Sequence, residues 1–137
     1  MNAVRLIRSP SLKHAEYADA SVVPAGAEII FLAGACPLDD IGNTVAPGDI
    51  AIQTAKALQN MDVALAASGA SRDDVAFVRV LVATHASEDL GVAWAAVRHH
   101  FGAHQVPATL QGVTVLGYPG QLVEIEPIAV RRAGDED

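Results

Sequence analysis

The chain has 137 residues, of which 51% are hydrophobic, 18% charged and 4% aromatic, and its net charge is −7. This length and apolar content predict one domain with a packed core and exclude a largely disordered chain. The acidic balance, without a basic cluster before Arg131 and Arg132, argues against a nucleic-acid partner and against binding to an anionic membrane surface.

The sequence also predicts a cytoplasmic protein. It has no run of 18 apolar residues, so no membrane-spanning helix is expected, and the first residues lack the long apolar stretch of a secretory leader. The single cysteine, Cys36, cannot form an internal disulfide and suits a reducing compartment. We expect one domain over residues 1–137, with a frayed, solvated tail at 132–137.

Seven elements are predicted from β-branched runs, helical spacing and turn residues. In chain order they are strands over 20–23 and 28–35, a helix over 49–68, a strand over 75–84, a helix over 87–102, and strands over 108–116 and 122–130. The first two strands are placed to pair through the turn at 24–27, and a turn at 117–120 joins the last two. Residues 36–49 are rich in Pro, Gly, Asp and Asn, which predicts a loop.

Both predicted helices have end signals. The first helix has one face formed by Ile50, Thr54, Ala57, Leu58, Met61 and Leu65. Gly48 and Asp49 can cap its start, and Gly69 suits its end. The second helix has Ser87 as its predicted N-cap and Gly102 as its stop, with acidic residues near its start and basic residues near its end.

This order of elements predicts an α+β domain in which both helices cover one face of a mixed sheet. The opposite face of the sheet is then bare, and its apolar residues need cover from another molecule. A second copy of the chain is the simplest cover, so we expect a homo-oligomer.

Few residues show a catalytic or metal-binding pattern. The sequence has no glycine-rich phosphate loop, no metal-ligand spacing and no serine-nucleophile motif. The adjacent His99 and His100 point to different sides of a helix, and all five histidines fit exposed helix-end or loop positions more simply than metal ligation. Cys36 has no obvious base nearby and is more typical of a small apolar side chain than of a nucleophile. We therefore expect no metal site.

Polar residues alternate along the last two predicted strands. Glu124 and Glu126 fall on one face of their strand, and Thr109 and Gln111 fall on one face of theirs. A solvated sheet face is the simpler explanation. If the two strands pair and a neighbouring subunit covers them, the polar faces converge on a cleft, where a carboxylate serves as a base or hydrogen-bond acceptor.

Three segments share a family pattern, in register over residues 16–132: AGACPLDDIGNTVAPGDIAIQTAKALQNMDVALAASGASRDDV, VPAT and LVEIEPIAVRR. They resemble the Rid (YjgF) family. The resemblance implies a chorismate-mutase-like α+β fold, with a six-stranded mixed sheet and two helices on one face, assembled as a homotrimer with pockets between subunits. It also implies hydrolysis of reactive enamines and imines, such as 2-aminoacrylate, to keto acids and ammonia without a metal or an organic cofactor.

The resemblance assigns one catalytic residue, Glu124, and five substrate-binding residues, Tyr17, Gly34, Trp94, Thr109 and Gln111. Glu124 matches the acid that orients the attacking water, Tyr17 a tyrosine near the pocket mouth, and Gly34 a glycine that lines the pocket. Many members have asparagine near Trp94, so a large ring there reshapes the pocket. Core positions for Tyr17 and Trp94 are the alternative.

In deaminating members the motif is Pro-Ala-Arg, and its arginine binds the substrate carboxylate through two parallel hydrogen bonds. Thr109 occupies the arginine position, and Gln111 the next-but-one position, which often contacts the ligand. Threonine is short and uncharged and cannot replace this contact, whose loss costs roughly 2–5 kcal/mol. The resemblance therefore predicts weak activity on 2-imino acids.

The leading hypothesis is a hydrolase or deaminase that acts on a small imine, enamine or related metabolite without the usual carboxylate. The alternative is a non-catalytic trimer that binds a small ligand or regulates another process. Ribonuclease activity, sometimes attributed to the family, is disfavoured by the net charge of −7. Gln53 and Asn60 match the family pattern, but as helix residues they are expected to be structural hydrogen-bond donors.

Overall fold

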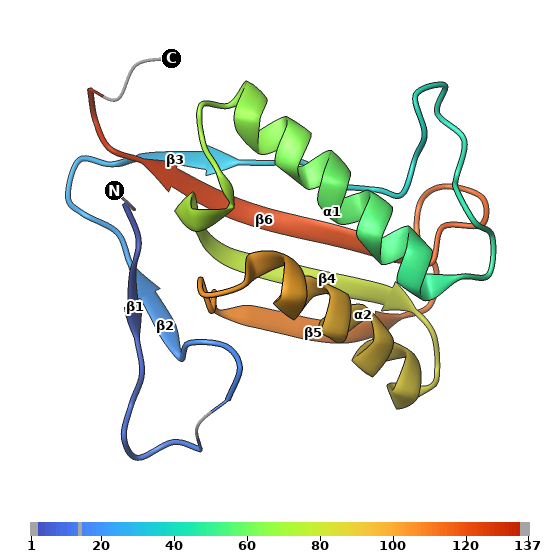
Figure 1. The fold of residues 1–137 in the computed structure, drawn as a ribbon, viewed down its shortest axis with the longest axis horizontal. Coiled ribbons are helices and arrows are strands. Elements are labelled where there is room, and N and C mark those ends of the chain that lie inside the picture. The colour runs from blue at the N-terminus through green and yellow to red at the C-terminus, as the bar shows by residue number, and fades with distance from the viewer. Residues whose placement is uncertain (1–2, 14, 135–137) are drawn as a thin grey trace.

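The computed structural model of the chain describes residues 3–13 and 15–134 (Figure 1). In chain order its elements are β1 (Arg5–Ile7), β2 (Ala20–Val22), β3 (Glu28–Phe31), α1 (Ile50–Ala67), a 3-10 helix η1 (Arg72–Asp74), β4 (Val75–Ala83), α2 (Ser87–Phe101), β5 (Ala108–Val113) and β6 (Val123–Arg131). Among the described residues, neither α-helix is long and apolar enough to cross a bilayer. The predicted tail is exposed over 132–134, and the rest of it lies outside the described residues.

Four strands form a mixed sheet in the order β3-β6-β4-β5. β6 is antiparallel to both β3 and β4, whereas β4 and β5 are parallel and are joined by α2. Both α-helices cover the same face of this sheet (Figure 1). The predicted α+β architecture, with two helices on one face of a mixed sheet, is therefore confirmed.

A single six-stranded sheet is not confirmed, because the six strands divide into sheets of four and two. The predicted pairing between the strands expected at 20–23 and 28–35, which are β2 and β3 of the structure, is wrong. β2 pairs with β1, through Ser21 and Leu6, and β3 pairs with β6, through Phe31 and Ile128. A three-residue strand such as β1 is too short to show a period in the sequence, so its pairing was missed. The Ser21 hydroxyl ties this hairpin to the main sheet by donating to the Ala76 carbonyl at 2.6 Å.

The predicted helix ends are largely confirmed. Asp49 is the N-cap of α1, and its side chain accepts a hydrogen bond from the Ile52 amide at 2.9 Å. In α2 the N-cap is Ala86 rather than Ser87. Thr84 explains this shift, because its hydroxyl accepts from the Ala86 amide and so satisfies a group just before the helix.

Two strand ends differ from the prediction. β5 ends at Val113 instead of extending to residue 116, and β3 ends at Phe31 instead of residue 35. After β3 the chain returns to β6 at a single bridge between Ala35 and Ile125. β5 ends where its partner β4 ends, at Ala83. β6 continues opposite residues 32–35, but this segment pairs with it only at the Ala35–Ile125 bridge.

The core lies between the helices and the sheet. Leu58, Met61 and Leu65 of α1 are at most 2% exposed and face buried valines of β4 and β6. The sheet side of this core is Val78, Val80, Val82, Val123, Ile125 and Ala129, and α2 adds Ala93, Val97 and Phe101. Burial of each large side chain stabilises the fold by about 1.5–3 kcal/mol, which fixes the face that the helices cover.

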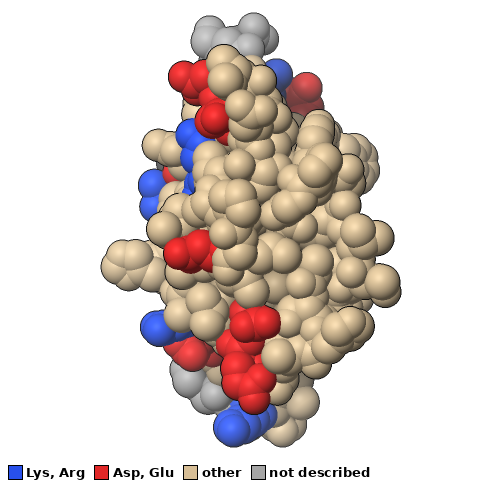
Figure 2. Space-filling model, turned by 90° about the vertical axis from the view of Figure 1, so that its right-hand side faces the viewer, with Lys and Arg blue, Asp and Glu red and all other residues tan. Residues whose placement is uncertain are grey.

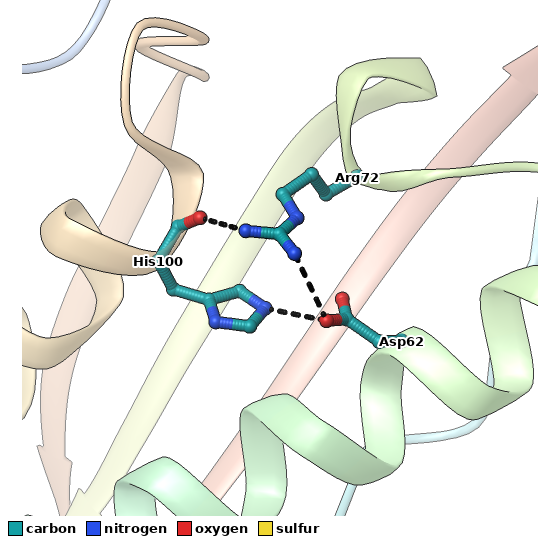
Figure 3. Close-up of polar contacts among 3 residues, drawn as sticks. All are labelled: Asp62, Arg72 and His100. Atoms are coloured by element: carbon teal, nitrogen blue, oxygen red, sulfur yellow. Dashed lines mark hydrogen bonds and ion pairs between the residues drawn. The ribbon is translucent and has the colours of Figure 1, made fainter.

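A polar cluster joins both α-helices to η1, which directly precedes β4 (Figure 3). Asp62 of α1 lies 2.9 Å from the His100 ring Nε2 of α2 and 3.5 Å from an Arg72 nitrogen. Arg72 also donates to the His100 backbone carbonyl at 2.6 Å. Asp62 thereby accepts contacts from two elements that are far apart in the sequence.

The sheet face away from the helices is uncovered except at one end, where Ala3 and Val4 pack against Ala76 and Val130. Its apolar residues include Phe31 on the edge strand β3, which is 78% exposed. Figure 2 shows the end of the molecule that carries the loop over 36–49 and the connection between β5 and β6. Charged side chains gather along one side of this view, and most of the other visible surface is uncharged.

Candidate functional site

The alternating polar residues of β5 and β6 lie on the uncovered sheet face, in register with β4. Thr109 pairs with Arg79, and Arg79 pairs in turn with Glu126. Arg79 donates to Glu126 Oε1 at 3.0 Å, and both side chains are more than 40% exposed. This row of the sheet thus combines an uncharged Thr109 with a balanced ion pair.

The next row contains Gln111, Leu81 and Glu124. β4 lies between β5 and β6, so the last two predicted strands do not pair directly. Gln111 and Glu124 are separated by two strand spacings, roughly 10 Å. A ligand that contacts both side chains from one protomer must therefore span Leu81.

Glu124 has different surroundings at its two carboxylate oxygens. Oε1 accepts a hydrogen bond from Gln121 Nε2 at 3.1 Å and a weaker one from the Cys36 thiol at 3.5 Å. No residue that the structure describes donates a hydrogen bond to Oε2. Glu124 is half-buried, and among the described residues only one of its two oxygens has hydrogen-bond donors.

Gly34 is required by the close approach of Glu124. A Cβ atom at Gly34 would lie 2.6 Å from the Glu124 carboxyl carbon and still closer to Oε2. The bridge between Ala35 and Ile125, with hydrogen bonds of 2.6 and 3.0 Å, holds this part of the chain beside β6. The two residues expected to line one pocket, Gly34 and Glu124, are therefore in direct contact.

Cys36 and Gln121 complete this group, and their contacts with Glu124 were not anticipated. Burial, the charge of Glu124 and the hydrogen bond to it raise the pKa of the Cys36 thiol to about 11, although Gln121 opposes this shift. The thiol is therefore protonated near neutral pH and acts as a hydrogen-bond donor rather than a nucleophile. Cys36 and Glu124 are 88 positions apart, and only the returning chain after β3 brings them together.

Two helix residues fix the loops around this group. Gln53, fully buried in α1, donates to the carbonyls of Ala46 and Gly120 and accepts from the Leu122 amide at 2.7 Å. Asn60 donates to the carbonyls of Cys36 and Leu38 at 2.8 and 3.0 Å. These contacts confirm the structural role expected for both side chains.

Tyr17 and Trp94 contact each other away from Glu124. Their rings meet edge to face with centroids 6.0 Å apart. Together with Ala108 and Leu110 they line a cavity of about 350 Å³ beside β5. Tyr17 is 42% exposed, so its ring is not a core side chain.

The six candidate residues therefore divide into three groups within one protomer. Glu124 and Gly34 lie in contact, Thr109 and Gln111 lie on β5, and the two aromatic rings lie next to the neighbouring positions of that strand. Leu110 packs against the helix-covered core, whereas Thr109 is exposed. The aromatic pair and Thr109 thus approach β5 from opposite faces.

The histidines differ partly from the expectation of exposed positions. His104 is 6% exposed, and its Nε2 lies 2.8 Å from the Val75 carbonyl. His100 is half-buried beside Asp62, whereas His85 and His99 are exposed and His14 lies outside the described residues. Among the residues that the structure describes, no three His, Cys, Asp or Glu side chains are grouped to hold a metal ion.

Comparisons with known proteins give consistent results. A family model described as endoribonuclease L-PSP matches residues 11–131. The structure of YyfB, a Rid-family protein of Yersinia pestis, is similar with a TM-score of 0.86 and 25% identity, over 93% of this chain and 98% of that chain. A member of the YjgF/YER057c/UK114 family from Mycobacterium tuberculosis has a TM-score of 0.62 and 26% identity, over 92% and 98% of the two chains.

A YjgF-family protein from Neisseria meningitidis has a TM-score of 0.62 and 25% identity, over 96% of this chain and 97% of that chain. A search of curated proteins gives no match. The similarity extends over nearly the whole length of both chains in each structural comparison, so the shared unit is the complete domain described above.

Proposed function

Because this chain belongs to the endoribonuclease L-PSP family, which includes the Rid and YjgF proteins, we propose that it is a hydrolase or deaminase of small metabolites. Its substrate is an imine, an enamine or a related compound without a carboxylate beside the reacting carbon. The reaction takes place at a pocket between subunits and depends on Glu124.

The observation that carries this proposal is the position of Glu124. Its carboxylate lies on the uncovered sheet face, with Oε1 held by Gln121 and Cys36 and with Oε2 close to the Gly34 backbone. A fixed carboxylate whose second oxygen has no hydrogen-bond donor among the described residues is suited to accept a proton from water. The raised pKa of Cys36 keeps the thiol protonated, so it does not compete as a nucleophile.

The chemistry requires only water and one proton acceptor. Glu124 takes a proton from water while the hydroxide oxygen bonds to the C=N carbon and the nitrogen takes a proton from solvent, which gives a carbinolamine. Glu124 then returns its proton to the nitrogen as the C–N bond breaks. The hydroxyl proton is released in this step, and the products are the carbonyl compound and ammonia.

Thr109 supports a substrate that lacks the carboxylate. Its hydroxyl can donate one hydrogen bond but brings no charge. Arg79 lies beside Thr109 in the sheet, but its guanidinium is engaged by Glu126 at 3.0 Å. The charge of Arg79 is therefore already balanced by Glu126. We propose that Arg79 does not replace the family's arginine.

We propose a trimer because, within one protomer, Glu124 lies apart from the candidate residues of β5 and from the two aromatic rings. Phe31, 78% exposed, and the rest of the uncovered face need apolar cover. A second copy packed on this face brings its own β5 or its own aromatic pair toward Glu124. The lone Cys36, free of a disulfide, supports the cytoplasmic location that we propose for the assembly.

The experiment is release of ammonia from imines generated in the assay by an amine oxidase, measured for the native protein, Glu124→Gln and Glu126→Gln. Glu126 is the matched control because it lies on the same strand and face but pairs with Arg79. We expect Glu124→Gln to abolish turnover and Glu126→Gln to retain it. Equal turnover in all three proteins would remove Glu124 from the reaction.

Two further assays on the same proteins identify the alternatives. Saturable stabilisation of the native protein by an imine or carbonyl compound, without product, would indicate a binding or regulatory trimer. Cleavage of RNA that is lost in Glu124→Gln would instead support the activity in the family's name. The net charge of −7 and the uncharged surface in Figure 2 provide little attraction for phosphates.

A further inference from the structure

Gln121 is an almost fully buried amide at the start of the strand that carries Glu124. It is 4% exposed, and all of its polar atoms have partners. Its Oε1 accepts from the Tyr118 amide at 3.0 Å, and its Nε2 donates to the Val123 carbonyl and to Glu124 Oε1, both at 3.1 Å. An amide bonded at both ends has one orientation, so it presents its N–H to Glu124 without rearrangement.

The backbone around Gln121 is itself held in place. Gln53 of α1 donates to the Gly120 carbonyl at 3.0 Å and accepts from the Leu122 amide at 2.7 Å. These are the residues immediately before and after Gln121. Gln53 thus fixes the backbone on both sides of Gln121. This holds the Gln121 amide in contact with the Glu124 carboxylate.

Gly34 limits the position of the other carboxylate oxygen. Oε2 lies where a Cβ atom would be, and no donor among the described residues contacts it. The Cys36 thiol adds a second contact to Oε1, at 3.5 Å. Oε1 has two donors, whereas Oε2 packs against the Gly34 backbone without a donor among the described residues, so the two oxygens have different surroundings.

We propose that Gln121 is a positioning residue that anchors Oε1 of Glu124 and thereby leaves Oε2 as the oxygen that receives the proton from water. The effect of Gln121 on catalysis rests on the proposed function. Gln121 contacts neither substrate nor water in this account and acts only through Glu124. Misplacing a reacting group by about 1 Å can lower a rate on the order of 10²-fold.

The first test is kinetic and uses Gln121→Met, which keeps the length of the side chain but removes the amide. We expect kcat to fall on the order of 10²-fold with KM unchanged. The exposed Gln59→Met on α1 is the matched control and should retain native kcat. Native kcat in Gln121→Met, or a loss equal to that in Gln59→Met, would overturn the proposal.

The second test needs no turnover and uses the fact that Cys36 is the only cysteine. The rate of thiol alkylation as a function of pH gives the pKa of Cys36, which is about 11 in the native protein. The Glu124 charge and hydrogen bond raise this pKa, whereas the direct contact with Gln121 lowers it. The two possible roles of Gln121 therefore predict opposite shifts in Gln121→Met.

If Gln121 holds Glu124 beside the thiol, Gln121→Met releases the carboxylate and the pKa of Cys36 falls, as it does in Glu124→Gln. If Gln121 does not position Glu124, only its direct effect is lost and the pKa stays the same or rises. A fall supports the proposal, and either other result overturns it. The kinetics of Glu124→Gln test the proposed function separately, so failure of one idea is distinguishable from failure of the other.

Discussion

The carboxyl group of Glu124 lies over the backbone of Gly34, so close that a Cβ atom at Gly34 would be 2.6 Å from the carboxyl carbon. Backbone strain is not the reason for glycine here, since the need comes from the space that Glu124 occupies. The neighbouring Ala35 is paired with Ile125, which prevents the chain from moving away. The orientation of Glu124, the candidate catalytic residue, therefore depends on the glycine at position 34.

Gly34→Ala should therefore displace Glu124. We expect a loss of about 1–3 kcal/mol in the free energy of unfolding, from overpacking, and a fall in turnover on the order of 10²-fold. Urea denaturation and ammonia release measure the two effects. Gly91→Ala is the control, because Gly91 is exposed in α2 with nothing within 4 Å of its Cβ position, and this change should stabilise the helix by up to about 1 kcal/mol. Native turnover in Gly34→Ala would show that the position of Glu124 is unimportant.

The cluster in Figure 3 predicts a different kind of effect, on stability alone. Asp62→Ala removes the contacts to His100 and Arg72 that join α1, α2 and η1. These side chains are 21–45% exposed, so solvent screens them and we expect a loss of only about 1 kcal/mol in urea denaturation. Glu126→Ala breaks a single, more exposed pair and should change stability by less than about 0.5 kcal/mol. Equal losses in the two variants would mean that the cluster adds nothing beyond one surface pair.

The uncovered sheet face predicts self-association. We expect the native protein to sediment with about three times the 14.2 kDa mass of one chain. Phe31→Asp puts a charge on this face at a residue that is already 78% exposed, so it should produce monomers without unfolding the chain. Val63→Asp is the matched change on the exposed side of α1 and should leave the trimer intact. A native protein that is monomeric at tens of micromolar would contradict the interface-pocket account.

Much of the main sheet and both helices could be predicted from local signals. The spacing of Leu58, Met61 and Leu65 and the capping by Asp49 depend on neighbours within two turns, so the sequence contains them directly. β1 and the partner of β3 could not be found in this way. Pairing is a long-range choice, and a three-residue strand such as β1 shows no period of its own.

The candidate site could likewise be predicted only where the signal was local. Alternation placed Glu124 with Glu126 on one face of their strand and Thr109 with Gln111 on one face of theirs. The register through β4 puts both pairs on the same face of the sheet. Alternation could not show that Cys36 and Gln121 would both contact Glu124, because a bridge after β3 and a connection before β6 create that contact. The one local signal for Gln121 in the sequence is its position three residues before Glu124.

The most direct test of the account compares matched imines that differ only in a carboxylate beside the C=N carbon, with native protein and Thr109→Arg. An amine oxidase and an amino-acid oxidase can generate such a pair from an amine and the corresponding amino acid. We expect the native kcat/KM for ammonia release to favour the imine without the carboxylate. Thr109→Arg should raise kcat/KM for the 2-imino acid by roughly 30-fold or more, which corresponds to at least about 2 kcal/mol.

Arg79→Met, measured alongside, shows whether the neighbouring cation contributes to any activity on the 2-imino acid. The account predicts that this variant keeps the native preference, because Arg79 is already paired with Glu126. A native protein that prefers the 2-imino acid and gains nothing from Thr109→Arg would contradict the central claim that this family member has lost its carboxylate-binding group.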